Sequence, residues 1–419
     1  MKSSFQKISS LAVATRKASR SLAILSTDTK NRVLREMAQA LVAATPQIIA
    51  QNKKDLRVGE KKKLSAAMMD RLMLNEKRVV VMAEGLKEVA SLPDPVGEKV
   101  TEWVRPNGLK VLRVRIPLGV IAVVYESRPN VTVDAAGLCF KSGNAVILRG
   151  GSEAFHSNQI LGKILQQVLK KNKIPPQVIS IFPTTDRKDL EALLQLTSLI
   201  DVAIPRGGES LMKFMEEHSK VPVIKHDKGV CNLFIDESAD ISKALKIVEN
   251  AKVQRPGVCN SLENLLIHEK IAPQILPLLA KDLYSKGVEL RGDSRARKIV
   301  KTIELAQEKD WSTEYLDLIL SVKIVKNMEE ALGFIQKYGS HHTEAIVTEN
   351  LKQAQQFIRS LDSSCVVVNA STRFNDGGEL GLGAEIGIST TKLHAYGPMG
   401  LEELTTKQFV VWGKGQIRL

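Results

Sequence analysis

Apolar positions along the chain follow two periods, and the alternation between them predicts its architecture. Short apolar runs of strand length are followed by stretches in which apolar residues recur every three or four positions, as on one face of a helix. The first series contains expected strands at 120–125, 145–148, 178–182, 201–204 and 221–225, separated by expected helices at 131–141, 153–171, 187–196 and 209–218. Strands that alternate with helices indicate a mostly parallel sheet with both faces covered.

The same pattern restarts beyond residue 228. Expected strands lie at 232–235, 265–268, 318–325, 344–348 and 365–369, with expected helices at 241–250, 328–337 and 351–361 and one that ends near 286. The two series predict an α/β fold of two doubly wound domains, at 1–228 and 229–369, followed by a C-terminal segment at 370–419. A length of 419 residues, 43% of them hydrophobic, supplies enough material for two cores.

One segment interrupts the alternation of strands and helices. Residues 99–104 and 109–116 are strand-like and meet at Pro106-Asn107-Gly108, where Asn-Gly favours a tight hairpin turn. A lone hairpin is marginally stable in water and needs partners. The strand-like tail at 408–412 could provide one. A homo-oligomer that shares these strands is therefore one expectation, and pairing within the chain is the other.

The residues before Asp28 are basic and rich in serine and alanine, as in a transit peptide. Their apolar positions instead recur at helical spacing and run into an expected helix at 31–44, so we expect mature structure here. No run of about 18 uncharged apolar residues occurs, so no membrane span is expected. The four cysteines form no CxxC pair and no HExxH motif occurs, so we expect a reducing cytoplasm, no disulfide and no metal.

The formal charge of +14 makes a basic nucleic-acid-binding scaffold an alternative class of function. Basic and acidic residues are interspersed, however, and the aromatic residues on which bases stack make up only 4% of the chain. Attraction of small anionic ligands explains the charge equally well. We therefore expect no nucleic-acid partner.

The segment Arg255-Pro256-Gly257-Val258-Cys259-Asn260 carries the clearest chemistry. A Pro-Gly pair cannot continue a helix, so it presents Cys259 on a turn as a candidate nucleophile. A thiol with a pKa of about 8.5 is only slightly ionised at neutral pH and needs a cation or donor beside it, a role open to Arg255. The segment alone also fits a small buried residue. No P-loop or GxGxxG motif accompanies it, and the glycine-rich stretch at 381–387 has the wrong spacing.

Five long motifs, in order along nearly the whole chain, resemble the aldehyde dehydrogenase superfamily. They lie at 125–132 (YESRPNVT), 143–151 (GNAVILRGG), 254–260 (QRPGVCN), 376–390 and 397–400 (GPMG). The resemblance implies that the first domain binds the cofactor, that the second carries the nucleophile, and that the hairpin is an oligomerisation element. Within the superfamily the chain is similar to the branch that reduces L-glutamate 5-phosphate to L-glutamate 5-semialdehyde with NADPH, a step of proline biosynthesis.

Under this resemblance Cys259 attacks the acyl phosphate and forms a thioester. Asn130 and the backbone N–H of Cys259 correspond to the oxyanion hole, although an asparagine at this position is also a favourable helix cap. Arg149 and Ser152 correspond to residues near the adenine ribose, where serine instead of an acidic residue favours NADPH. An arginine at a strand end is more often a solvated surface group than a ligand, which is the alternative for Arg149.

The remaining site residues follow from the same resemblance. Gly207 and Gly208 are expected to approach the pyrophosphate, with a plain turn as the alternative, and Glu314 to hold the nicotinamide ribose. The substrate's carboxylate or phosphate is expected to contact two arginines and the C-terminal motif, namely Arg128, Arg255, Asn375, Asp376, Glu385 and Ser389. Tyr396 departs from the pattern, because relatives commonly have arginine there.

A missing glutamate determines the expected chemistry. Hydrolytic aldehyde dehydrogenases carry a water-activating glutamate 34 residues before the cysteine, and that position is Lys225 here. A thioester without this base resists hydrolysis and awaits hydride or phosphate. His226 and Asp227 follow and are expected to form a structural pair. The alternative hypothesis is a hydrolytic NAD-dependent aldehyde dehydrogenase that acts on an acidic semialdehyde. Under the leading hypothesis, glutamate 5-kinase, which makes the acyl phosphate, is a candidate partner.

Overall fold

The computed structural model describes residues 2–225 and 228–418, and the chain divides into two compact units. Among the described residues, unit 1 contains everything up to Lys225, then Gly381–Gly387 and the residues from Met399 onward. Unit 2 contains 228–380 and Ile388–Pro398. The C-terminal segment is thus shared between the units. No helix of the described residues is long and apolar enough to cross a bilayer.

Unit 1 is built on a four-stranded parallel sheet in the order β5-β4-β3-β6. Its strands are β3 (Val120–Tyr125), β4 (Ala145–Arg149), β5 (Ile179–Ile181) and β6 (Val202–Arg206). The connecting helices are α6 (Asn130–Lys141), α7 (Phe155–Lys171), α8 (Arg187–Leu194) and α9 (Glu209–His218), with short 3-10 turns η1 (Ser152–Ala154) and η2 (Pro176–Val178). Every residue of β3 and β4 is buried, as expected for strands covered on both faces.

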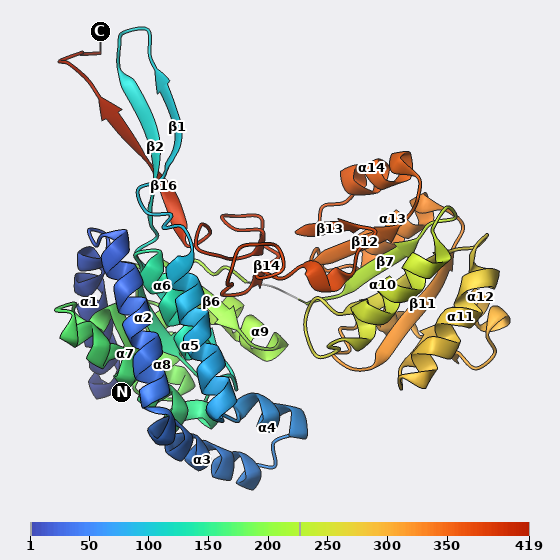
Figure 1. The fold of residues 1–419 in the computed structure, drawn as a ribbon, viewed down its shortest axis with the longest axis horizontal. Helices are drawn as coiled ribbons and strands as arrows, with labels where there is room; N and C mark the ends of the chain where they lie inside the picture. Colours follow the sequence, from blue (N-terminus) through green and yellow to red (C-terminus); the bar gives the residue numbers. More distant parts are fainter. Residues whose placement is uncertain (1, 226–227, 419) are drawn as a thin grey trace. The chain divides into compact units, whose positions relative to one another are not determined.

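The N-terminal region adds a helical layer to unit 1 (Figure 1). Its helices are α1 (Lys2–Leu22), α2 (Thr27–Ala43), α3 (Thr45–Lys61), α4 (Ala66–Leu72) and α5 (Glu76–Ser91). The basic first residues form α1, in which Ile8 and Ala12 are buried as their helical spacing predicted. Helix α2 packs against α5 and α7, and α3 packs against α7. The layer is therefore joined directly to the helices that cover the sheet.

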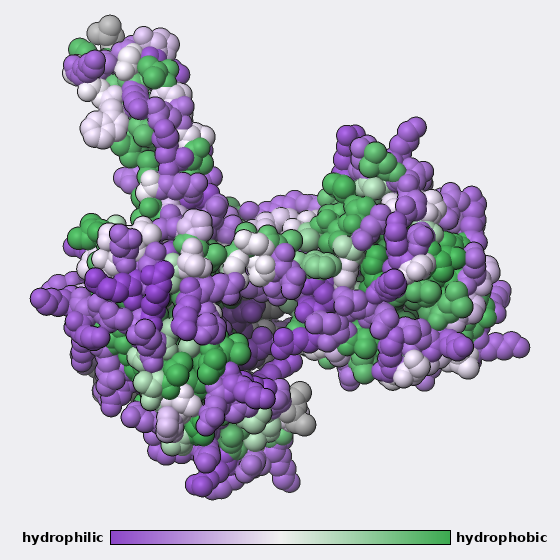
Figure 2. Space-filling view, viewed as in Figure 1, coloured by the Kyte–Doolittle hydropathy of each residue, from purple (hydrophilic) through white to green (hydrophobic). Residues whose placement is uncertain are grey.

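An antiparallel three-stranded arm extends from the rest of unit 1 (Figure 1). It consists of β1 (Lys99–Val104), β2 (Lys110–Pro117) and the tail strand β16 (Thr405–Trp412), in the order β1-β2-β16. The hairpin turn places Gly108 at φ +82°, a conformation that glycine adopts without strain. The tail pairs with β2 of the same chain along its full length. Apolar and polar side chains alternate on the surface of this arm (Figure 2).

Unit 2 contains a seven-stranded parallel sheet in the order β10-β9-β11-β8-β7-β12-β13. The strands are β7 (Cys231–Ile235), β8 (Leu262–His268), β9 (Glu289–Gly292), β10 (Glu304–Leu305), β11 (Ile319–Val325), β12 (Thr343–Val347) and β13 (Cys365–Val368). The helices and turns are α10 (Ile241–Val253), α11 (Ala272–Ser285), α12 (Ser294–Ile299), η3 (Glu308–Ser312), α13 (Met328–Tyr338), α14 (Leu351–Ser360) and η4 (Thr372–Phe374). A short antiparallel pair, β14 (Ile388–Ser389) and β15 (Gly397–Pro398), follows.

Alternate residues of β7 supply the two cores of unit 2. Leu233 and Ile235 join an apolar cluster with residues of α10 and α11, whereas Phe234 joins a second cluster with residues of α13 and α14. This alternation is the period of two that a strand imposes on its side chains. The two-domain α/β pattern expected from the sequence is therefore present in both units.

The strand expected at 221–225 was a wrong prediction. Only a single bridge forms here, between Ala203 and Val223, and Pro222 interrupts the ladder. The carbonyl of Pro222 accepts a hydrogen bond from the Ala203 N–H at 2.8 Å, but proline has no N–H with which to continue the pairing.

Candidate functional site

The strand order of unit 1 reverses between β3 and β6, which defines a topological switch point. In open α/β sheets, ligands bind outside the carboxyl ends of the strands at such a point. The loop after β3 contains Arg128 and ends at Asn130, the first residue of α6, and the loop after β6 contains Gly207 and Gly208. Four of the residues predicted from sequence therefore lie at one edge of the sheet.

Helix capping leaves the same edge open to an anion. The N-terminus of α7 is filled by the Asp55 carboxylate, which accepts hydrogen bonds from the His156 N–H at 3.0 Å and the Ser157 N–H at 2.8 Å. Asp186 caps α8 in the same manner. In the described chain no side chain caps α6 or α9, the helices that follow the switch-point strands. The positive end of α6 is therefore available to a phosphate, whereas at the start of α9 the Gly208 N–H already donates to the Glu126 carboxylate.

Close packing surrounds the glycines at the start of α9. The Gly208 N–H donates to Glu126 Oε2 at 3.0 Å, and a Cβ built on Gly207 would lie 2.6 Å from the same oxygen. A Cβ built on Gly208 would meet no atom within 4 Å. A side chain at Gly207 would therefore require the Glu126 and Leu211 side chains to shift, whereas Gly208 faces open space.

Asn130 is the first residue of α6 and does not cap it. Pro129 occupies the cap position, and Asn130 Nδ2 donates instead to Asp134 Oδ2 at 2.9 Å. The capping alternative for Asn130 is therefore wrong. Burial raises the pKa of Asp134 to about 6, against the opposing effects of Asn130 and the Arg206 guanidinium.

Arg149 is buried at the end of β4, with 8% of its surface exposed, so the alternative of a solvated surface arginine is wrong. Its Nη2 donates to the Thr185 carbonyl at 2.9 Å, and its Nε is buried without a hydrogen-bond partner in the described chain. A cavity of about 530 Å³ lies beside Ser152 and is also lined by Lys62 and Thr184. A buried unpaired N–H near a polar cavity fits the ribose or phosphate of a nucleotide.

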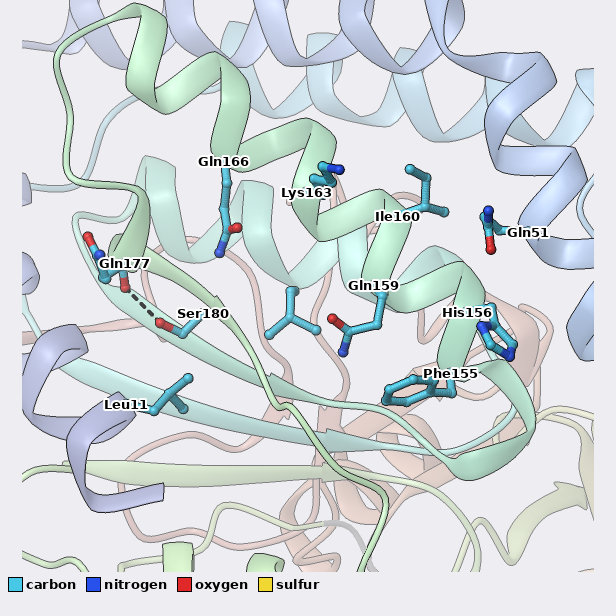
Figure 3. Close-up of a pocket in the computed structure, with 11 residues that line it drawn as sticks. Leu11, Gln51, Phe155, His156, Gln159, Ile160, Lys163, Gln166, Gln177 and Ser180 are labelled. Carbon is cyan, nitrogen blue, oxygen red and sulfur yellow. Dashed lines mark hydrogen bonds between the residues drawn. The ribbon is translucent and has the colours of Figure 1, made fainter. Parts of the chain in front are cut away.

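A second cavity of unit 1, about 520 Å³ in volume, lies along α7 and β5 (Figure 3). Gln159 Nε2 donates to the Phe182 carbonyl at 3.0 Å, and Gln166 Nε2 donates to the Ile179 carbonyl at 2.7 Å. β5 is an edge strand, so these side chains provide the partners that a neighbouring strand would supply. We therefore assign this cavity to the scaffold.

In unit 2 the cysteine loop, defined as Gln254–Asn260, joins α10 to β8. Cys259 is partly exposed on this loop. A Cβ built on Gly229 would lie 2.1 Å from the carbonyl oxygen of Cys259 and 2.6 Å from its Cα. The thiol of Cys231 donates to that same carbonyl at 3.2 Å. Burial holds the pKa of Cys231 well above its usual value, so this thiol stays protonated and able to donate.

Buried polar residues continue beneath the loop at the amino end of β12. His342 Nδ1 lies 3.6 Å from Cys231 Sγ and 2.7 Å from Thr343 Oγ1, and Asn375 Nδ2 donates to the same hydroxyl at 2.8 Å. Of this set only Asn375 was expected at the site from the sequence, because the other members are separated by more than a hundred residues from Cys231 and belong to no motif. Fixed spacing along the chain is the only signal that motif reading can use.

A second buried set lies one position further into the strands. Asn232 Nδ2 donates to Glu344 Oε2 at 2.8 Å, and Asn264 Nδ2 donates to Asn232 Oδ1 at 3.0 Å. Burial raises the pKa of Glu344 to about 8, although the hydrogen bonds from Asn232 and Ser363 act in the opposite direction. Glu344 is therefore predominantly neutral at pH 7.

A buried ion pair fixes the loop that contains Glu314. Lys252 Nζ lies 2.8 Å from Glu263 Oε2, and both side chains are fully buried. The Leu316 N–H donates to Glu263 Oε1 at 3.3 Å. Burial raises the pKa of Glu263 to about 7, and the ammonium of Lys252 acts against this increase. Glu314, partly buried, is thus connected to the start of β8 through its neighbour.

Three residues of the predicted substrate motif are buried or hydrogen-bonded to nearby groups of the protein. Asn375 is fully buried, Asp376 Oδ1 accepts from the Gly378 N–H at 3.0 Å, and Ser389 Oγ lies 2.8 Å from Thr391 Oγ1. Glu385 belongs to unit 1 and Ser389 to unit 2, so the motif crosses from one unit to the other.

The charged side chain that contacts both ends of the cysteine loop is Arg373, which sequence reasoning missed. Arg255, the expected cation, is exposed.

His226 and Asp227 lie outside the described residues. Among those that are described, no three His, Cys, Asp or Glu side chains form a group able to hold a metal ion.

The class of protein follows from these features together with a family match. A model of the aldehyde dehydrogenase family matches residues 3–296, and the chain belongs to this family. An acetylating aldehyde dehydrogenase from Geobacillus thermoglucosidasius shares the fold, with a TM-score of 0.70 at 19% identity, covering 100% of this chain and 98% of the other.

Within the family the chain is similar along its whole length to gamma-glutamyl phosphate reductases. The gamma-glutamyl phosphate reductase of Geobacter metallireducens is 55% identical over 413 residues, 99% of each chain. The crystal structure of gamma-glutamyl phosphate reductase from Thermotoga maritima has a TM-score of 0.96 at 44% identity and covers 98% of this chain and 100% of its own. This relationship confirms the expected fold and implies a nicotinamide cofactor.

Replacing Gly229 with alanine should displace the cysteine loop. The added Cβ overlaps backbone atoms of Cys259, which cannot turn aside as a side chain can, so Gly229→Ala should lower kcat by about tenfold or more. Gly333→Ala, at an exposed position of helix α13 with open space around its Cβ, is the matched control and should stabilise the protein slightly. Steady-state kinetics and thermal unfolding check both variants, and full activity in Gly229→Ala would contradict the packing argument.

Stability should depend on pH through Glu344. Because its folded-state pKa is raised from 4.5 to about 8, its stabilising contribution is fully present below about pH 4.5 and is lost as pH rises through 8. Between pH 5 and pH 8.5, the free energy of unfolding of wild type should fall by on the order of a few kcal/mol relative to that of Glu344→Gln. Urea unfolding at several pH values measures this difference. The exposed variant Glu304→Gln should follow wild type, and parallel curves for wild type and Glu344→Gln would refute the assignment.

Proposed function

We propose that this chain reduces L-glutamate 5-phosphate to L-glutamate 5-semialdehyde with NADPH and releases phosphate, a step of proline biosynthesis. The observation that carries the proposal is Cys259, held on a packed loop in a chain that is 55% identical along its length to a gamma-glutamyl phosphate reductase. Unit 1 is the cofactor-binding unit under this proposal, and unit 2 carries the nucleophile.

Cys259 is the proposed covalent catalyst. Its thiolate attacks the acyl carbon, the new C–S bond forms, and the bond to the phosphate oxygen breaks with release of phosphate. When bound, the reduced nicotinamide supplies the hydride that converts the acyl group to an aldehyde. The tetrahedral adduct on Cys259 then collapses: its C–S bond breaks, the electron pair returns to Sγ as the thiolate, and the aldehyde is released.

Asn130 is the proposed side-chain donor to the oxyanion, together with the backbone N–H of Cys259. A donor aimed at the developing negative charge contributes on the order of 3 kcal/mol. The Asp134 carboxyl accepts one N–H of the Asn130 amide and so orients it, which supports this role. The second N–H of the amide remains for substrate.

The proposed cofactor residues are those at the carboxyl edge of the unit 1 sheet, with Glu314 for the nicotinamide ribose. The unpaired Arg149 Nε and the open side of Gly208 support binding of phosphate or ribose there. Ser152 has no carboxylate that would repel a 2′-phosphate, and this supports NADPH over NADH. The same cavity is lined by Lys62 and by two aspartates, Asp55 and Asp186, which cap the starts of α7 and α8. Substrate binding is proposed for Arg128, Arg255, Asn375, Asp376, Glu385 and Ser389.

Lys225 supports reduction over hydrolysis. Its ammonium is paired with the Glu216 carboxylate, and a protonated amine cannot activate water as a carboxylate base does. The thioester on Cys259 is therefore expected to persist until hydride transfer.

The reverse reaction tests the proposed function most directly. Purified protein incubated with glutamate 5-semialdehyde, NADP⁺ and phosphate should form reduced cofactor, followed by absorbance. Omission of phosphate should stop the reaction, and NAD⁺ should support it poorly. Phosphate-independent reduction would instead favour a hydrolytic aldehyde dehydrogenase. Cys259→Ala should abolish turnover without changing thermal unfolding, and retained turnover would refute the mechanism.

Self-association through the arm is a second proposal, in agreement with the exposed apolar residues of β16. Phe409, Val411 and Trp412 are each more than half exposed, and β16 has one neighbouring strand, which leaves its other edge open to a second copy of the chain. Trp412→Lys should lower the mass measured by light scattering after gel filtration. Val81→Lys, at an exposed apolar residue of α5, is the control, and an equal mass for both variants would contradict the proposal.

A further inference from the structure

One arginine side chain joins the two ends of the cysteine loop. Arg373 Nε donates to Gln254 Oε1 at 2.8 Å, and Arg373 Nη1 donates to Asn260 Oδ1. Gln254 caps the end of α10, and Asn260 directly follows Cys259. The guanidinium therefore spans the loop on which the nucleophile is carried, although its own position in sequence is 113 residues beyond Asn260.

The turn that carries Arg373 is itself fixed to the sheet. Thr372 Oγ1 donates to the Asn260 carbonyl at 2.7 Å, and Asn260 Nδ2 donates to the Asn375 carbonyl at 2.9 Å. Asn375 is in turn bonded to Thr343 at the start of β12. Arg373 is therefore a rigid anchor for the loop, since its backbone and its side chain are both held in place.

The charge of Arg373 also acts on the cysteine loop. Burial lowers the pKa of Arg373, and the nearby Asp376 carboxylate and the Cys259 and Cys231 thiols act in the opposite direction. An interaction between a cation and a thiol is reciprocal, so the same guanidinium favours ionisation of Cys259. Arg255 is exposed whereas Arg373 is partly buried, so solvent screens the charge of Arg373 less than that of Arg255.

We infer that Arg373 is the positioning residue of the nucleophile: its guanidinium fixes both ends of the cysteine loop and supplies the positive charge beside which the Cys259 thiolate forms. The inference rests on the proposed role of Cys259 as nucleophile. Arginine suits this task because its planar fork reaches two acceptors at once, whereas lysine carries an equal charge on one nitrogen. Charge and bridging can therefore be separated by substitution.

The test compares Arg373→Met, which lacks the charge, with Arg373→Lys, which keeps it. The rate of Cys259 alkylation by iodoacetamide is measured against pH, with the modified peptide identified by mass spectrometry. We expect the midpoint of the pH profile to rise by about one unit or more in Arg373→Met and to stay near wild type in Arg373→Lys. Turnover should fall about tenfold or more in both, because neither side chain bridges Gln254 and Asn260.

Arg295→Met removes a partly exposed arginine of unit 2 that is bound to Asp293 and Glu330, and it should change neither quantity. An unchanged pH midpoint in folded Arg373→Met would overturn the charge role, and wild-type turnover in Arg373→Lys would overturn the bridging role. The Lys variant alone decides the second point if the Met variant does not fold. Alkylation reports on the thiol whatever the substrate is, so failure of the proposed function, seen as full activity in Cys259→Ala, is recognised separately.

Discussion

A buried polar side chain is costly without a hydrogen-bond partner, and pairing between strands dominates the amino ends of the strands in unit 2, where Asn264 Oδ1 is a buried atom without a partner in the described chain. Asn232, Glu263 and Glu344 are all fully buried there, and each is satisfied by a residue from another strand, helix or loop. Removal of one group leaves others unpaired, so the set is stable only when all the strands are in register. The cysteine loop lies on this base, and its backbone is positioned by the same assembly.

The local pattern of apolar residues was enough to predict the strands that are wholly buried and the helices that are clearly amphipathic. The strand Val120–Tyr125 and the helix Glu209–His218 were predicted to the residue, because an apolar run and a helical repeat are properties of neighbouring positions. The stretch at 221–225 looked equally apolar, yet Pro222 removes the donor that a ladder needs. Whether the tail pairs within the chain was also beyond the sequence, since both alternatives use the same alternating residues.

The site was predictable only where its residues are close together in sequence. Pro256 and Gly257 show that Cys259 is presented on a turn, and that information is local. Gly229 and Arg373 contact the same loop from distant segments, so no spacing rule finds them. Asn130 illustrates the other limit, because an asparagine at a helix start has the same local preference for capping whether or not a partner such as Asp134 is present.

The Asp55 carboxylate, which fills the N-terminus of α7, gives the N-terminal layer a role beyond packing. Without α3, two backbone amides and the positive end of a seventeen-residue helix would face solvent within reach of any phosphate, beside the cavity that contains Ser152. The layer thus works as an internal counter-anion that keeps a competing phosphate position closed.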